Sequence, residues 1–93
     1  MSVAFIRGFP NGRFTVTRIE REPDVEETAE RFIKAGGMYF IEVLADGDIN
    51  MSASTVNRDN SHTEVAEARC ANGPELPHAV DRLVRKSAEA LAQ

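Results

Sequence analysis

The chain has 93 residues and a net charge of −4, a length that suits one domain with a single core. Its hydrophobic content of 42% excludes the sparse composition of a disordered chain. The single cysteine, Cys70, excludes an internal disulfide and fits a reducing compartment. No apolar run approaches the roughly 18 residues of a membrane helix, and the N-terminus lacks a signal peptide. We therefore expect a cytoplasmic protein with no membrane contact.

The first segment predicts a β-hairpin. Two strand-like runs, residues 3–9 and 13–21, flank Pro10-Asn11-Gly12, and Asn-Gly favours a tight turn. Their apolar alternation is irregular, which indicates a peripheral pair of strands over residues 1–22. The sequence leaves open whether this hairpin joins the main sheet.

A helix is predicted next. Val25, Ala29, Phe32 and Ile33 follow the spacing of one helical face. Asp24 is expected to cap its start, with an acidic residue three positions later as in a capping box. Gly36-Gly37 is expected to end the helix.

The central segment, residues 38–56, predicts the main hairpin around Asp46-Gly47. A two-residue loop would pair Leu44 with Ile49 and Phe40 with Ala53. One face would then be core, with Glu42 as its lone charge, and the other would be half exposed. The predicted core face carries Met38, Phe40, Leu44, Ile49, Met51 and Ala53; the other face carries Tyr39, Ile41 and Val43 opposite Asn50, Ser52 and Ser54.

The last third predicts a strand and a helix. Residues 63–71 alternate as a third antiparallel strand, although their composition also suits a helix, and Asn72-Gly73-Pro74 is expected to stop it. A helix starts near Pro77, which is well placed in a first turn. On its outer face, Asp81 is expected to pair with Arg85 at i, i+4.

The order strand, strand, helix, strand, strand, strand, helix favours an α+β fold. We expect an antiparallel sheet of about five strands with two helices packed on one face. The whole chain, residues 1–93, would form one domain, in which the hairpin of residues 1–22 joins a core of residues 24–93.

No constellation predicts catalysis or a cofactor. His62 has Asp59 and Glu64 nearby and would suit a general base, but a solvated loop histidine is the simpler interpretation. Cys70 is expected to be a buried, inert thiol. The histidines and the cysteine lack zinc spacing, and turn chemistry explains Asp46-Gly47-Asp48 without calcium. The sequence therefore predicts a non-enzymatic protein with no metal or cofactor.

Two surfaces are candidate sites for an unidentified protein partner. The first is Tyr39, Ile41 and Val43; the N-terminal hairpin or a second copy in a homodimer would equally cover it. The second is the basic outer face of the last helix, which would hold phosphates or an acidic partner, or would simply be solvated. Its residues are His78, Arg82, Arg85 and Lys86. Nucleic-acid binding through this helix is the disfavoured alternative function. The acidic net charge would repel nucleic acid only if it were spread evenly, and a local basic stripe could still bind phosphates.

From Asp24 onward, the order helix, three strands, helix resembles the double-stranded-RNA-binding domain. That family uses a Gly-Pro-x-His loop and a basic block at the start of its last helix. The corresponding segments here read Ala45-Asp46-Gly47-Asp48 and Pro77-His78-Ala79-Val80-Asp81. Arg85-Lys86-Ser87-Ala88 is similar to the block but lies later in the helix. The resemblance implies the topology, whereas the loop and block depart from the binding motifs.

The segments GGMYFIEVLADGDI and NGPELPHAVDRLV resemble small bacteriophage and prophage open reading frames. The first segment is a short strand–turn–strand and the second leads into an amphipathic helix, and neither contains an enzyme motif. The resemblance implies an accessory protein that binds a host component. Anti-host proteins, among them anti-CRISPR inhibitors, are one such class.

Overall fold

A computed structural model describes residues 1–71 and 73–92. Its elements are β1 (Ser2–Gly8), β2 (Phe14–Glu20), α1 (Pro23–Lys34), β3 (Gly37–Val43), β4 (Ile49–Val56), β5 (His62–Cys70) and α2 (Leu76–Leu91). This α+β order is the predicted one, and the segment of residues 63–71 is a strand. The predicted strand stop at Asn72 lies outside the described residues. No helix in the described chain has the length and apolar character needed to cross a membrane.

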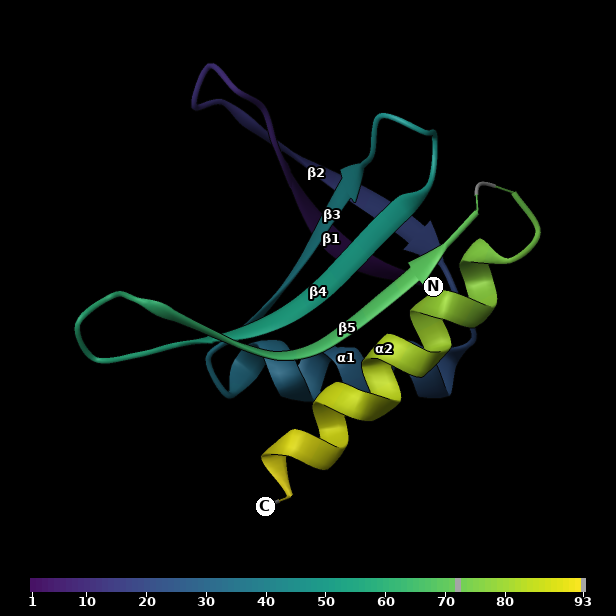
Figure 1. Cartoon of the computed structure of the whole chain (residues 1–93). Coiled ribbons are helices and arrows are strands. Elements are labelled where there is room, and N and C mark those ends of the chain that lie inside the picture. Colours follow the sequence, from purple (N-terminus) through teal and green to yellow (C-terminus); the bar gives the residue numbers. More distant parts are fainter. Residues whose placement is uncertain (72, 93) are drawn as a thin grey trace.

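The strands form one mixed sheet in the order β2-β1-β3-β4-β5 (Figure 1). Neighbouring strands are antiparallel except β1 and β3, which run parallel and meet at the pair Ile6 and Phe40. The prediction of an antiparallel sheet is therefore wrong at this seam. Its cause is α1, which follows the first hairpin and returns the chain so that β3 enters beside β1 in the same direction. The N-terminal hairpin thus belongs to the main sheet.

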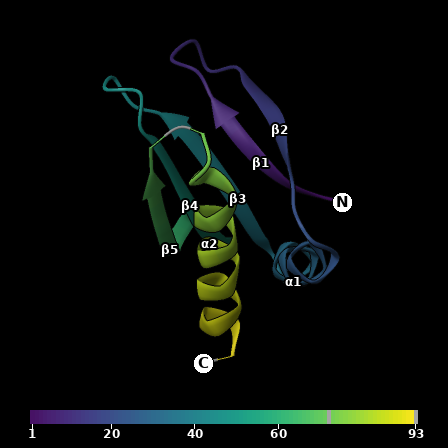
Figure 2. The same ribbon diagram turned by 90° about the vertical axis from the view of Figure 1, so that its right-hand side faces the viewer.

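Both helices pack on the same face of the sheet (Figures 1 and 2). The helix α1 contacts β1 and β3, and α2 contacts β4 and β5. Figure 2 shows α1 end-on while α2 runs from top to bottom, so the two helices are not parallel. The helix α1 begins at Pro23, and its N-cap, Glu22, makes no side-chain cap hydrogen bond within the described residues. The predicted Asp24 cap is wrong, since Asp24 lies inside the first turn, where it suits the helix dipole.

The core lies between the helices and the sheet. Strands contribute every second residue to it, and the helices contribute residues at three- and four-residue spacing. Its members are Val3, Phe5, Val25, Ala29, Phe32, Tyr39, Ile41, Ile49, Met51, Ala53, Ala66, Ala68, Cys70, Ala79, Val80, Leu83 and Val84. Within the described residues, every buried side-chain nitrogen or oxygen has a hydrogen-bond partner.

The three hairpin loops share one backbone geometry. They are Pro10-Asn11-Gly12, Ala45-Asp46-Gly47 and Arg58-Asp59-Asn60. In each loop, the third residue donates its N–H to the carbonyl of the residue before the loop, at 2.9 to 3.0 Å. That preceding residue donates its own N–H to the carbonyl of the residue after the loop, at 2.8 to 2.9 Å. These are three-residue loops of the kind that end in a left-handed residue and a bulge.

The residues at the second and third positions explain why these three segments form the same loop. The middle residue is Asn11, Asp46 or Asp59, and its side-chain oxygen accepts the N–H of the residue two positions later at 3.0 Å in every case. The third residue has a positive φ of 82° at Gly12, 89° at Gly47 and 67° at Asn60. Glycine and asparagine tolerate this conformation best.

The three-residue loop after β3 changes the pairing of the central hairpin. Val43 pairs with Ile49 and Tyr39 pairs with Ala53, one position away from the predicted register. Because side chains alternate along a strand, this shift reverses the two faces of β3. The predicted faces are therefore wrong: Tyr39 is 1% exposed in the core, and Phe40 lies on the opposite face. Glu42, predicted on the core face, is exposed on that opposite face.

The shared loop geometry predicts opposite effects of two substitutions. Gly47→Ala should lower the free energy of unfolding by about 1–2 kcal/mol, because alanine is strained at a φ of 89°. Asn60→Gly should leave stability unchanged or raise it slightly, because glycine adopts that conformation freely. Urea unfolding of both variants measures the difference. Equal destabilisation by both changes would contradict the shared loop geometry.

A second prediction concerns Gly37, where the first residue of β3 passes beneath a core ring. A Cβ at this position would overlap the Phe32 ring, and that ring is fully buried. Gly37→Ala should therefore destabilise the fold by about 1–3 kcal/mol through overpacking. The matched control is Gly8→Ala, whose Cβ would meet nothing within 4 Å. Thermal unfolding compares the two, and a silent Gly37→Ala would show that Phe32 moves aside freely.

Candidate functional site: the uncovered face of the sheet

Tyr39, predicted to bind a partner, lies at the centre of the core. Its ring centroid is 5.6 Å from that of Phe5 and 5.0 Å from that of Phe32. Ile41 is also buried, at 9% exposure, whereas Val43 is 51% exposed. The three residues therefore do not form the predicted partner surface. Tyr39 and Ile41 instead belong to the core between the sheet and the helices.

The Tyr39 hydroxyl has a defined partner in α2. Ser87 donates its hydroxyl hydrogen to the Val84 carbonyl at 2.7 Å. Its oxygen lies 2.7 Å from the Tyr39 oxygen, so Tyr39 donates and Ser87 accepts. Burial disfavours the charged phenolate and raises the pKa of Tyr39 to about 12. This hydrogen bond thus ties the central strand to the last helix.

The Tyr39 environment predicts a pH dependence of stability. An unperturbed tyrosine has a pKa of 10.0, and Tyr39 is raised to about 12, so the unfolded chain loses its phenolic proton first. The contribution of Tyr39 to stability should be complete below pH 10 and fall as the pH rises, by up to about 1.4 kcal/mol per pH unit. The ultraviolet absorbance of tyrosinate measures the titration directly, because Tyr39 is the only tyrosine. Tyr39→Phe is the blank, and a folded-state midpoint near 10 would contradict the buried hydroxyl.

The second predicted surface is present as a solvent-facing stripe. His78, Arg82, Arg85 and Lys86 are all exposed along the outer face of α2. Lys86 reaches the edge of the sheet, where its ammonium donates to the Glu67 carbonyl at 3.5 Å. We call these four residues the basic helix face.

Asp81 does not pair with Arg85 as predicted. It accepts two hydrogen bonds from Arg21, Nε to Oδ1 at 2.7 Å and Nη2 to Oδ2 at 2.6 Å. Both side chains are only 17% exposed, and the ion pair raises the pKa of Arg21. The partner of Asp81 therefore comes from the segment after β2, 60 residues away, and the pair ties the first hairpin to α2.

The face of the sheet opposite the helices carries a second set of apolar side chains. Ile6 pairs with Val16 on β2 and with Phe40 on β3, which places the three side chains on the same face. Phe14 and Val16 are 68% and 53% exposed. We call the set Ile6, Phe14, Val16, Met38 and Phe40 the sheet patch. This patch was missed from the sequence because a two-residue loop was expected at Asp46-Gly47, which placed Met38 and Phe40 in the core.

Two open hollows lie on the sheet patch. One, of about 260 Å³, is lined by Ile6, Phe14, Met38, Phe40 and His62. The other, of about 310 Å³, is lined by Ile6, Gly8, Phe40, Ile41, Glu42, Asn50 and Ser52. They share Ile6 and Phe40, the residues at which β1 and β3 pair. The hollows therefore adjoin each other along the seam between these strands.

His62 borders the sheet patch as the first residue of β5. Its ring meets the Phe40 ring edge-on, at 5.9 Å between centroids and an interplanar angle of 78°. Packing against an aromatic ring explains its position without a catalytic role.

Acidic side chains flank the sheet patch on the side of β4 and β5. Glu42 pairs with Asn50 across β3 and β4, while Glu67 and Glu64 of β5 pair with Ser52 and Ser54. All three glutamates are exposed, and none forms an ion pair within the described residues. We call Glu42, Glu64 and Glu67 the carboxylate row.

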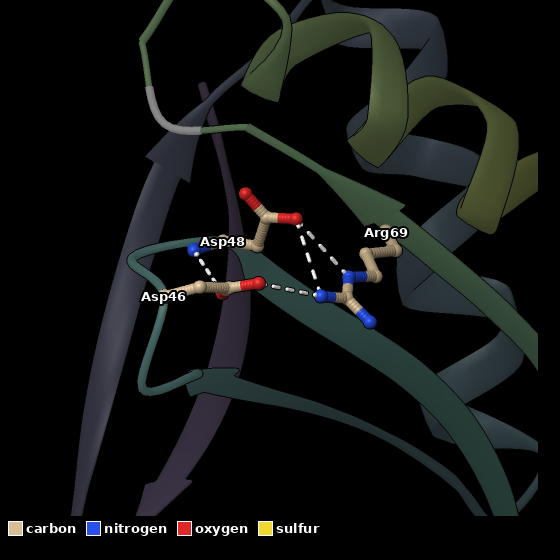
Figure 3. Close-up of polar contacts among 3 residues, drawn as sticks. All are labelled: Asp46, Asp48 and Arg69. Atoms are coloured by element: carbon tan, nitrogen blue, oxygen red, sulfur yellow. Dashed lines mark hydrogen bonds and ion pairs between the residues drawn. The ribbon is translucent and has the colours of Figure 1, made fainter.

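Arg69 lies on the same strand but is already neutralised. Its guanidinium contacts Asp46 at 3.0 Å and Asp48 at 3.2 Å, both from the loop between β3 and β4 (Figure 3). Asp46 also accepts the Asp48 N–H at 3.0 Å, which orients the two carboxylates toward the arginine. This ion-pair network explains why Asp46 and Asp48 lie close together.

The remaining titratable groups do not assemble into a reactive centre. Cys70 is buried as predicted, and desolvation raises the pKa of its thiol, which disfavours the nucleophilic thiolate. Among residues 1–71 and 73–92, no three His, Cys, Asp or Glu side chains are grouped to hold a metal ion.

No protein-family model, curated protein or solved structure matches this chain. Inference about function therefore starts from its own surfaces: the sheet patch with its carboxylate row, and the basic helix face.

Proposed function

We propose that this protein is a non-enzymatic module that binds another protein through the sheet patch. The observation that carries the proposal is the 68% exposure of Phe14 and 53% exposure of Val16 beside the hollows around Phe40. Contiguous apolar surface of this kind marks interaction sites in soluble proteins. Aromatic side chains beside hollows are also the usual centres of binding energy.

The resemblance of the central hairpin to phage and prophage accessory proteins supports a host protein as the partner. Inhibition of a host defence, as by anti-CRISPR proteins, is one activity that binding alone would achieve. The buried free thiol of Cys70 fits a reducing cytoplasm, where such a partner would be met. A second copy of the chain is the competing occupant of the patch.

The basic helix face favours nucleic-acid binding as a second candidate function. Its four side chains are exposed along one helix, and within the described residues Arg82 and Arg85 form no ion pair. Phosphate contacts through this face would make affinity fall steeply with salt. Binding through the apolar side chains of the sheet patch would lose less affinity at high salt, because apolar contacts are not screened by ions.

A double substitution tests the proposed function. Phe14→Thr with Val16→Thr should preserve the fold, because both side chains are exposed and threonine suits a strand. Loss of apolar contact should weaken partner binding by at least roughly tenfold. Tagged wild type and variant are compared by pull-down from bacterial lysate with mass spectrometry, followed by titration of the captured protein and measurement of oligomeric state.

Val43→Thr is the matched control, because Val43 is an exposed valine of β3 on the other face of the sheet. It should bind like the wild type. Capture that persists in the double variant but disappears after nuclease treatment would reject the patch and support the basic helix face. A concentration-dependent dimer lost in the double variant would identify a second copy as the occupant.

A further inference from the structure

We propose that the partner segment is a basic amphipathic helix, which lays its apolar side on the sheet patch and its Lys or Arg side chains beside the carboxylate row. This inference rests on the proposed function and adds the chemistry of the partner. Shape, backbone pairing and charge each support it.

The position of the patch favours a partner that contacts it through side chains. Ile6 and Phe40 lie on β1 and β3, interior strands with neighbours on both sides. An extended peptide that adds to a sheet pairs with the backbone of an edge strand and would leave these side chains uncovered. A helix carries its own backbone hydrogen bonds and can lie across interior strands.

The covered face of the same sheet already shows how a helix packs on β1 and β3. There, α1 covers β1 and β3 by burying Val25, Ala29 and Phe32, which share one helical stripe. The uncovered face presents apolar side chains on the same two strands. Its hollows of about 260 and 310 Å³ each greatly exceed the roughly 30 Å³ of one water molecule. Large apolar side chains one helical turn apart would fill them.

The negative charge of the carboxylate row favours a partner helix with basic side chains. The carboxylate row places three free negative charges on the side of β4 and β5, while Arg69 nearby is held by Asp46 and Asp48. Arg18, which pairs with Ala4, is the basic side chain of this face on β2, at the far edge. Complementary charge across an interface steers association and rejects partners of the wrong sign. A helix with Lys or Arg along one border of its apolar stripe meets this pattern, whereas an acidic helix or a phosphate backbone is repelled.

Synthetic helical peptides of equal length test the chemistry directly. Three probes are used: one of Leu and Lys, one of Leu and Glu, and one of Ser and Lys, each with the same amphipathic spacing. Fluorescence anisotropy at low salt measures their affinity for the whole folded chain. The Leu and Lys probe should bind at least roughly tenfold more tightly than either other probe.

Two sets of substitutions locate the binding. Phe14→Thr with Val16→Thr should abolish binding of the Leu and Lys probe. Glu42→Gln, Glu64→Gln and Glu67→Gln together should remove its advantage over the Leu and Glu probe. The matched control, Glu30→Gln, Glu75→Gln and Glu89→Gln, changes the net charge equally at exposed glutamates of α1 and around α2 and should leave the preference intact.

The outcomes separate this inference from the proposed function. Equal binding of both Leu probes, lost in the Phe14 and Val16 double variant, would overturn the charge argument and leave the patch as the protein-binding site. Binding of the Leu and Lys probe that survives the double variant would overturn both. Binding of the Ser and Lys probe as tight as that of the Leu and Lys probe would show attraction by charge alone and reject a docked helix.

Discussion

The inward position of Tyr39 is the constraint on which the rest of the structure depends. Its ring packs between Phe5 of β1 and Phe32 of α1, and its hydroxyl binds Ser87 of α2. One side chain thus joins the sheet to both helices. The three-residue loop at Ala45-Asp46-Gly47 sets the pairing that turns Tyr39 toward the helices. The same pairing turns Phe40 to the uncovered face, so the core and the candidate site arise from one choice of register.

The first hairpin completes both faces of the sheet. On the helix side, Phe5 is fully buried, and on the other side Ile6 pairs with Phe40 and Val16. Its backbone pairing with β3 is limited to one position, so side chains carry much of the attachment. The ion pair between Arg21 and Asp81 adds a bidentate contact of low exposure to that attachment. The exposed residues Phe14 and Val16 are therefore presented by a hairpin held from its buried side.

The two candidate surfaces differ in sign and position. The basic helix face is the solvent-exposed side of α2, whereas the carboxylate row lies on the uncovered face of the sheet. The net charge of −4 is a sum over the whole chain and does not reveal that one surface is basic and the other acidic. A partner attracted by one face is repelled by the other, so charge substitutions on each face can assign binding to one of them.

The sequence by itself determined the order of the elements and the residues at which the hairpins turn, because periodicity and turn chemistry are local. It did not determine which face of β3 is buried. Asp46-Gly47 is compatible with a two-residue or a three-residue loop, and the two choices place opposite faces in the core. Only tertiary packing selects between them, because Tyr39 finds Phe5, Phe32 and Ser87 on one side alone. The pairing of Asp81 with Arg21 in place of Arg85 has the same origin, since a contact between distant segments forms only after the sheet has brought them together.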